Sequence, residues 1–252
     1  MGVTLGLIGA GGSTMTVPIM VYLFGLDTVL ATTYSLFIVG FTSLIGSYKH
    51  YKLNNISWKF VFLFGLSSIF SVVLSRTYLI HLLPDIIFST PAFTLSKNTF
   101  LLIIFAVLML FSSFSMIKKK TVSLEIPSPI IHPIQIIFAG FLVGLITGIV
   151  GVGGGFLIIP VLTNWAHLPV KKAVATSLFI ITINSLIGFS VDHDGLKHID
   201  WIHMTFFSIV AILGIMLGIR WSVLISGEKL KPLFGWFILF MGTSILISEF
   251  LK

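Results

Sequence analysis

The chain has 252 residues, of which 56% are hydrophobic and only 9% are charged. A soluble domain carries about 25% charged residues, so this composition excludes a water-soluble protein and indicates a polytopic membrane protein. The formal net charge of +7 does not indicate nucleic-acid binding, because the lysines lie in short loops between apolar runs and act there as topology signals. The sequence contains no cysteine, which excludes disulfides and thiolate metal sites.

Eight apolar stretches are long enough to cross a bilayer, which takes about 20 residues. They lie at residues 1–24, 29–48, 58–80, 99–117, 134–165, 170–190, 202–225 and 232–249. A connector with two prolines follows the third stretch at 83–98, and triple lysine followed by prolines predicts a linker between two halves. We therefore expect an all-α protein with a first transmembrane repeat over residues 1–117, a cytoplasmic linker over 118–133 and a second transmembrane repeat over 134–252.

The fifth stretch is interrupted by Gly151-Val152-Gly153-Gly154-Gly155. Each glycine costs about 1 kcal/mol relative to alanine inside a helix, so we expect the helix to break here. Within a bilayer, non-helical backbone is tolerated only where protein or a water-filled cavity surrounds it. The sequence therefore predicts a broken membrane helix beside a binding site or a pore lining.

A second glycine run, Gly9-Ala10-Gly11-Gly12-Ser13, stands 142 residues earlier. Over positions 6 to 46, 15 of 41 residues are identical to the residue 142 positions later, without a gap. The chain is thus an internal duplication, and paired glycine interruptions in two halves point to a transporter's binding site. The first half lacks about a dozen residues that precede Gly148 in the second, from which we expect a misplaced start or a shortened first helix.

Corresponding loops carry opposite charge, since lysines follow the second stretch and aspartates follow the sixth. Such antisymmetry is expected of inverted repeats. Inversion needs an odd number of crossings in each half, which arises if the first and fifth stretches are re-entrant hairpins. Eleven basic residues then lie inside, namely Lys49, Lys52, Lys59, Lys118, Lys119, Lys120, Lys171, Lys172, Arg220, Lys229 and Lys231. Four lie outside, namely Arg76, Lys97, Lys197 and Lys252.

The glycine runs favour anion binding. A half-helix that starts after each break presents unpaired N–H groups and a partial positive charge, and two opposed N-termini would hold a small anion. The alternative is tight packing of helices through small residues. The candidate substrate-binding residues are Gly9, Gly11, Gly12, Ser13, Ser35, Gly151, Gly153, Gly154, Gly155, Ser177 and Asn184.

Two further polar features can be explained without a substrate. Arg76 and Arg220 end the third and seventh stretches, and we expect interfacial arginines that reach head groups, with recruitment of an anion at the mouth as the alternative. The polar stretch 192–203 contains three aspartates and three histidines; we expect a solvated loop, with a divalent-metal site or a proton relay as the alternative. No cofactor is expected, because the chain has no phosphate-binding loop, no H-E-x-x-H motif and no complete dinucleotide fingerprint.

Together these residues resemble the TauE/SafE sulfite-exporter family. The resemblance rests on Gly6-Leu-Ile-Gly-Ala-Gly-Gly-Ser-Thr-Met-Thr-Val-Pro18, on Gly148-Ile-Val-Gly-Val-Gly-Gly-Gly-Phe-Leu-Ile-Ile-Pro160, on Ala-x-x-x-Ser-Leu-Phe-Ile at 31–38 and 173–180, and on Gly195-Leu-Lys-His-Ile-Asp-Trp201. It implies transport of sulfite, sulfonates or related sulfur-containing anions across the plasma membrane, driven by ion or proton gradients. Ser13 departs from the second run, which has Gly155 at that position.

The sequence thus predicts a multi-pass permease of the inner (plasma) membrane, whose partners are a small-molecule anion and the lipid bilayer. Alternatives are a divalent-metal carrier that uses the His/Asp loop, and a non-transporting membrane scaffold or assembly factor. An enzyme is not expected, because no nucleophile–base arrangement is evident. The substrate, direction, coupling ion and oligomeric state stay open.

Overall fold

The computed structural model describes residues 1–9, 11–90, 93–117, 132–224 and 227–251. Its long helices are α3 (Thr28–Lys52), α7 (Lys97–Ile117), α8 (Pro133–Val150), α10 (Val170–Ser190), α12 (Trp201–Leu224) and α13 (Gly227–Phe250). The shorter helices are α1 (Gly2–Ile8), α2 (Gly11–Tyr22), α9 (Gly155–Asn164) and α11 (His193–Leu196). One continuous rod is made of α4 (Trp58–Phe60), the π-turn η1 (Val61–Gly65), α5 (Leu66–Leu74), the π-turn η2 (Ser75–Leu79) and α6 (Ile80–Leu82).

Seven helical segments in the described part of the chain are long and apolar enough to cross a membrane: Thr28–Lys52, Trp58–Leu82, Lys97–Ile117, Pro133–Val150, Val170–Ser190, Trp201–Ser222 and Leu230–Phe250. Large apolar side chains cover their outer faces; Phe111 is 75% exposed and Ile202 is 81% exposed. Such a surface suits lipid rather than water. The prediction of a predominantly helical, multi-pass membrane protein is confirmed.

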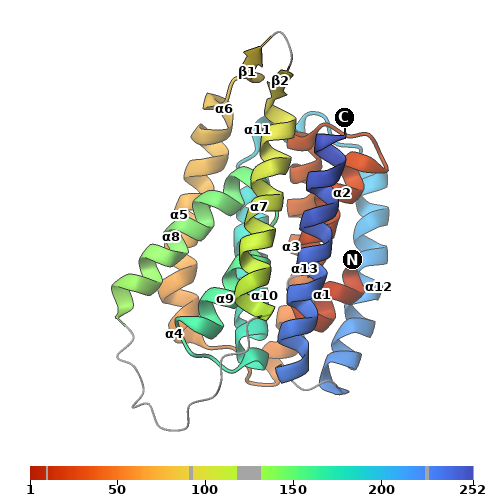
Figure 1. Cartoon of the computed structure of the whole chain (residues 1–252). Coiled ribbons are helices and arrows are strands. Elements are labelled where there is room, and N and C mark those ends of the chain that lie inside the picture. The colour runs from red at the N-terminus through yellow and green to blue at the C-terminus, as the bar shows by residue number, and fades with distance from the viewer. Residues whose placement is uncertain (10, 91–92, 118–131, 225–226, 252) are drawn as a thin grey trace.

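The connector after α6 departs from the all-α expectation. It folds into a two-stranded antiparallel hairpin, β1 (Ile86–Thr90) and β2 (Phe93–Ser96), in which Phe88 pairs with Leu95 and Ser89 with Thr94. Apolar and β-branched side chains in this stretch favour strands over a helix. The hairpin lies beyond one end of the helices (Figure 1).

Both halves of the chain contribute to each end of the bundle (Figure 1). At the end that carries the strands, called the upper end here, Tyr22 donates to Glu249 at 2.8 Å and Asn98 donates to Asp27 at 2.7 Å. At the lower end, Asn164 is hydrogen-bonded to Ser115 at 2.7 Å and to Lys231 at 2.9 Å. Most of the linker predicted between the halves, at residues 118–131, lies outside the described residues.

Helices α3 and α10 form the centre of the bundle and run antiparallel. Ser43 meets Thr182 at 3.0 Å in their middle, and Thr33, near the start of α3, meets Asp192, just after the end of α10, at 2.6 Å. Around them α1 packs on α12, α8 on α5 and α7 on α13. Glycine permits the closest of these contacts: a Cβ built on Gly144 of α8 would overlap Ser68 and Ser71 of α5.

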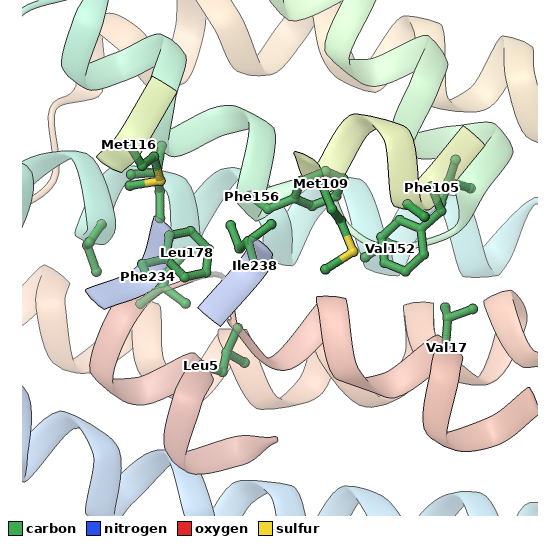
Figure 2. Close-up of a cluster of buried hydrophobic side chains, with 14 of the residues drawn as sticks. Leu5, Val17, Phe105, Met109, Met116, Val152, Phe156, Leu178, Phe234 and Ile238 are labelled. Carbon is green, nitrogen blue, oxygen red and sulfur yellow. The ribbon is translucent and has the colours of Figure 1, made fainter. Parts of the chain in front are cut away.

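A large apolar cluster joins α1, α2, α7, α8, α9, α10, α12 and α13 (Figure 2). It includes Phe105 and Phe156, whose ring centroids lie 5.7 Å apart. It also includes Val152, the one side chain among the glycines of residues 151–155, which is completely buried. Burial of a valine stabilises by about 1.5–3 kcal/mol, so Val152 fixes the glycine loop to the core.

Candidate functional site

The second glycine run breaks its helix, as the sequence predicts. Helix α8 ends at Val150 and α9 begins at Gly155. Between them, Gly151, Gly153 and Gly154 have φ of +68°, +61° and +77°, a left-handed conformation that only glycine adopts without strain. We refer to residues 151–154 as the glycine loop.

The first glycine run also interrupts its helix. Helix α1 ends at Ile8, Gly9 follows at φ +77°, and its N–H donates to the carbonyl of Leu5 at 2.7 Å. Helix α2 begins at Gly11. A Cβ on Gly12 would lie 2.7 Å from Leu5, so this glycine lets α2 pack against α1. Ala10 and the side chain of Ser13 lie outside what the structure describes.

Each break is the tip of a helical hairpin. Along the helical segment 58–82, Gly140 of α8 lies against Phe64 of η1 and Gly148 lies further up, against Ser75 of η2. Helix α8 therefore rises toward the upper end, whereas α9 descends to Asn164 at the lower end (Figure 1). Helices α1 and α2 do the reverse: α1 descends along α12, and α2 rises to Tyr22 at the upper end.

The glycine loop is buried against α3 and α10. A Cβ on Gly151 would overlap both Thr32 and Nη2 of Arg76. A Cβ on Gly153 would lie 2.7 Å from Oγ of Ser185 and 3.3 Å from Val39. A side chain at Gly151 or Gly153 would therefore displace a neighbour, which explains these glycines independently of a ligand.

Two buried serine hydroxyls on the helices that enclose the glycine loop, α3 and α10, have no hydrogen-bond partner in the described part of the chain. Ser35 and Ser185 are fully buried, and no hydrogen-bond partner exists for either Oγ among the described residues. Ser35 lies between Thr32 and Val39 at helical spacing and shares their face of α3. An unpartnered buried hydroxyl costs about 1–3 kcal/mol, and a bound ligand with polar atoms would remove that cost.

The other two polar candidates make their hydrogen bonds elsewhere. Ser177 donates to the carbonyl of Val174 in its own helix at 2.9 Å. Asn184 donates to Oγ of Ser68 on α5 at 3.0 Å, and also lines an apolar groove of about 210 Å³ between α10 and the rod that contains α5. Sequence reasoning overlooked Ser185, although the identical segments Ser43-Leu-Ile-Gly46 and Ser185-Leu-Ile-Gly188 pointed to it.

Arg76 is not the interfacial residue that the sequence suggested. Its side chain is 0% exposed, and its Nη1 donates to Oδ2 of Asp192 at 2.9 Å. The same carboxylate accepts from Thr33 Oγ1 at 2.6 Å and from the Gly195 N–H at 3.3 Å. The prediction that Arg76 reaches the head groups is therefore wrong, because a carboxylate from the other half pairs with it in the interior.

The guanidinium also reaches the glycine loop. Its Nη2 is the atom that a side chain at Gly151 would strike. Neither Nη2 nor Nε has a hydrogen-bond partner among the described residues. The glycine loop is thus bordered by a partly unpartnered cation and by two unpartnered hydroxyls, a set of donors that suits an anion.

The rest of the polar loop is solvated, as expected, but Asp192 is not. Asp194 is exposed, and hydrogen bonds from Lys197 at 2.8 Å and His81 at 3.1 Å hold its pKa below the usual range. Asp200 is likewise exposed and bonded to His203 at 2.6 Å, which lowers its pKa. Within the described ranges, no three His, Asp or Glu side chains gather into a group that could hold a metal ion.

Comparison with known proteins decides the family. The family described as "Sulfite exporter TauE/SafE" matches residues 1–245. The chain belongs to the TauE/SafE family. No solved structure gives a significant match. As TauE/SafE is a family of membrane transporters rather than of enzymes, the expectation of a transporter is confirmed at that level.

Several relatives align over most of the chain. "Probable membrane transporter protein MJ0441" of Methanocaldococcus jannaschii is 27% identical over 98% of this chain and 92% of its own length. "Probable membrane transporter protein YunE" of Bacillus subtilis is 28% identical over 78% and 76%. A "Probable membrane transporter protein" of Haemophilus influenzae is 26% identical over 85% and 79%.

The unpartnered hydroxyls lead to a stability prediction. We expect Ser185→Ala to leave the free energy of unfolding unchanged or to raise it by up to about 1 kcal/mol, because it removes a buried group that has no partner. The matched control is Ser112→Ala on α7, whose hydroxyl donates to the carbonyl of Phe156; its loss costs about 1 kcal/mol. Thermal unfolding of both variants in detergent, without added anion, measures the difference. Equal destabilisation by the two substitutions would contradict the assignment.

Proposed function

We propose that the chain is a permease that moves sulfite, a sulfonate or a related small sulfur-containing anion across the plasma membrane, as a secondary transporter driven by an ion gradient. The observation that carries the proposal is the glycine loop, where a helix breaks in the protein interior beside donors that lack acceptors. Membership of a transporter family supports transport, and the family description supports sulfite chemistry.

The chemistry of the loop suits an oxyanion. The first N–H groups of α9, those of Gly155 and Phe156, precede the first hydrogen bonds to the Gly154 carbonyl and carry a partial positive charge. Gly154 is the N-cap and supplies no side chain to bond them. With the hydroxyls of Ser35 and Ser185 nearby, an anion would find several donors without a flexible charged side chain crossing the bilayer.

We also infer that the two halves are inverted copies, because contacts between them come in matched pairs. Gly151 lies against Thr32, and Gly9 lies against Val174. Adding 142 to Gly9 gives Gly151, and adding 142 to Thr32 gives Val174. The break of each half therefore touches the same position of the other half, which supports a two-fold relation.

Hydrogen bonds between the two halves also come in pairs that join corresponding positions. The Ser57 N–H donates to Thr176 Oγ1 at 3.0 Å, and the Asp200 N–H donates to Tyr34 Oη at 2.7 Å. Tyr34 and Thr176 are 142 positions apart, while Ser57 and Asp200 are 143 apart, one residue more. Both donors stand directly before a tryptophan that starts a membrane segment.

The direction of the central helices supports inversion rather than a parallel repeat. A Cβ on Gly188 would lie 3.4 Å from Leu36, and a Cβ on Gly46 would lie 3.4 Å from Leu178, the corresponding pair. A two-fold axis that exchanges two antiparallel helices is perpendicular to their long axes. In a bundle that spans the membrane, that axis lies in the membrane plane, as in transporters with inverted repeats.

The distribution of charge supports re-entrant hairpins with the lower end inside. The lysines at the end of α3, in α4 and at the start of α10 lie at the lower end, whereas Lys97 and Lys197 lie at the upper end (Figure 1). An excess of lysine marks the cytoplasmic side. The two hairpins would then enter from opposite faces, and each tip would pass the middle of the bundle, since Gly151 lies against Thr32 near the start of α3 and Gly9 against Val174 near the start of α10.

Single-cysteine variants test this topology cleanly, because the chain contains no cysteine. We expect Lys171→Cys to react with a membrane-impermeant thiol reagent only from the cytoplasmic side, and Asp194→Cys only from the opposite side. Intact and permeabilised cells give the comparison. Lys52 and Asp194 are corresponding positions, 142 residues apart, so labelling of Lys52→Cys and Asp194→Cys from the same side would contradict the inverted arrangement.

Anion binding tests the function. We expect sulfite or a sulfonate to stabilise the purified chain in detergent by RT ln(1 + [L]/Kd), about 2.7 kcal/mol at a hundredfold excess over Kd. The double variant Ser35→Ala/Ser185→Ala should lose most of this stabilisation. The control is Ser190→Ala, whose exposed hydroxyl bonds to its own helix.

A thermal-shift series reports the result. Stabilisation by no sulfur oxyanion would contradict the proposed function, and stabilisation by a divalent cation instead would favour the metal carrier.

A further inference from the structure

The guanidinium of Arg76 is a charged group that borders the glycine loop. Its five N–H donors lie in one plane and form edges that match two oxygens at a time. Nη1 is committed to Asp192. Nε and Nη2 both lack a partner among the described residues. These two nitrogens form the side edge of the guanidinium, on which two N–H bonds point the same way.

This edge lies at the break. Nη2 occupies the space that a side chain at Gly151 would need. Leaving two donors of a buried cation unpaired is costly, because hydrogen bonds to charged groups are among the strongest in proteins. Asp192 accepts a hydrogen bond from Nη1, and Thr33 donates to Asp192. These bonds orient the Nε–Nη2 edge before any ligand binds.

We propose that Arg76 is a substrate-binding residue, whose Nε–Nη2 edge takes two oxygens of a singly charged oxyanion head such as a sulfonate or hydrogensulfite. The inference rests on the proposed function and names the charge class of its substrate. Asp192 acts as a positioning residue: it orients the guanidinium and cancels its charge.

The charge class follows from the surroundings. Arg76 and Asp192 sum to zero, and the described side chains that the loop glycines contact, such as Thr32, Thr147 and Ser185, are uncharged. A single negative charge then finds the guanidinium edge and the N-terminus of α9. The second charge of a dianion would find no counter-charge in a medium of low dielectric constant, where an unpaired charge is expensive.

The α1–α2 break lacks an equivalent charge pair. With the one-residue insertion noted above, Arg76 corresponds to Ile219, and Asp192 corresponds to His50. Ile219 is buried in the apolar cluster. Arg220 is exposed on α12. The charged contact with substrate therefore belongs to the α8–α9 break.

The alternative is that the pair only holds helices together, as buried ion pairs can. Two substitutions separate the cases. Arg76→Lys keeps the charge but loses the planar edge, and should weaken binding of methanesulfonate at least tenfold. Asp192→Asn keeps the edge but removes the negative charge. It should bind methanesulfonate at least as tightly as the wild type and gain at least tenfold in affinity for sulfate, a dianion.

Isothermal titration of the full-length protein in detergent, with methanesulfonate, sulfate and chloride as probes, measures these affinities. Arg220→Lys is the matched control and should behave as the wild type. The pair Arg76→Gln/Asp192→Asn has no buried charge to destabilise the fold; it should remain folded and bind none of the probes.

The outcomes separate the two proposals. If the wild type binds no sulfur oxyanion, the proposed function fails and this inference fails with it. If the wild type binds methanesulfonate but Arg76→Lys and the uncharged pair bind it equally well, Arg76 is not a binding residue, although the proposed function stands. If Asp192→Asn leaves the preference for methanesulfonate over sulfate unchanged, the charge rule is wrong.

Discussion

A bilayer offers no hydrogen-bond partner to a peptide group, so a membrane helix can be interrupted only where protein encloses the gap. In this chain, α3 and α10 provide that enclosure. Gly151 and Gly153 lie against Thr32, Val39 and Ser185, so the loop backbone has protein on the sides where lipid would leave it unsatisfied. Val152 anchors the loop in the apolar cluster from the opposite side. The position of the break and the burial of polar side chains around it depend on this requirement.

The same requirement explains the polar lining of the interior. Where backbone donors point into the protein, polar side chains can be buried beside them at a moderate free-energy cost. A ligand that forms hydrogen bonds with several of these groups would offset that cost. The unpartnered hydroxyls of Ser35 and Ser185 and the free edge of Arg76 are such groups. By contrast, Ser177 and Asn184 are already bonded to protein. Under the proposed function, the unpartnered groups are available to a ligand, whereas the bonded groups stabilise the bundle.

Much of this arrangement could be predicted from the sequence. Four glycines in five positions fixed the place of the break, and the chemistry of glycine made it a left-handed loop. What the sequence could not provide was pairing across the fold. Arg76 and Asp192 are 116 residues apart, and each taken alone fits a membrane interface or a solvated loop. Serines at 35 and 177 stand at equivalent positions, yet only the first lacks a partner, which depends on packing. The strand hairpin after α6 was likewise not predicted, because it lies in a connector between the apolar stretches.

The central claim is that a sulfur oxyanion passes through the broken helices, and counterflow tests it most directly. Liposomes that contain the purified chain are loaded with unlabelled sulfite or methanesulfonate and diluted into a trace of the labelled anion. The account predicts transient accumulation of label above its equilibrium level with the chain present, and none in protein-free liposomes. Equal label in both, for every sulfur oxyanion tried, would contradict it.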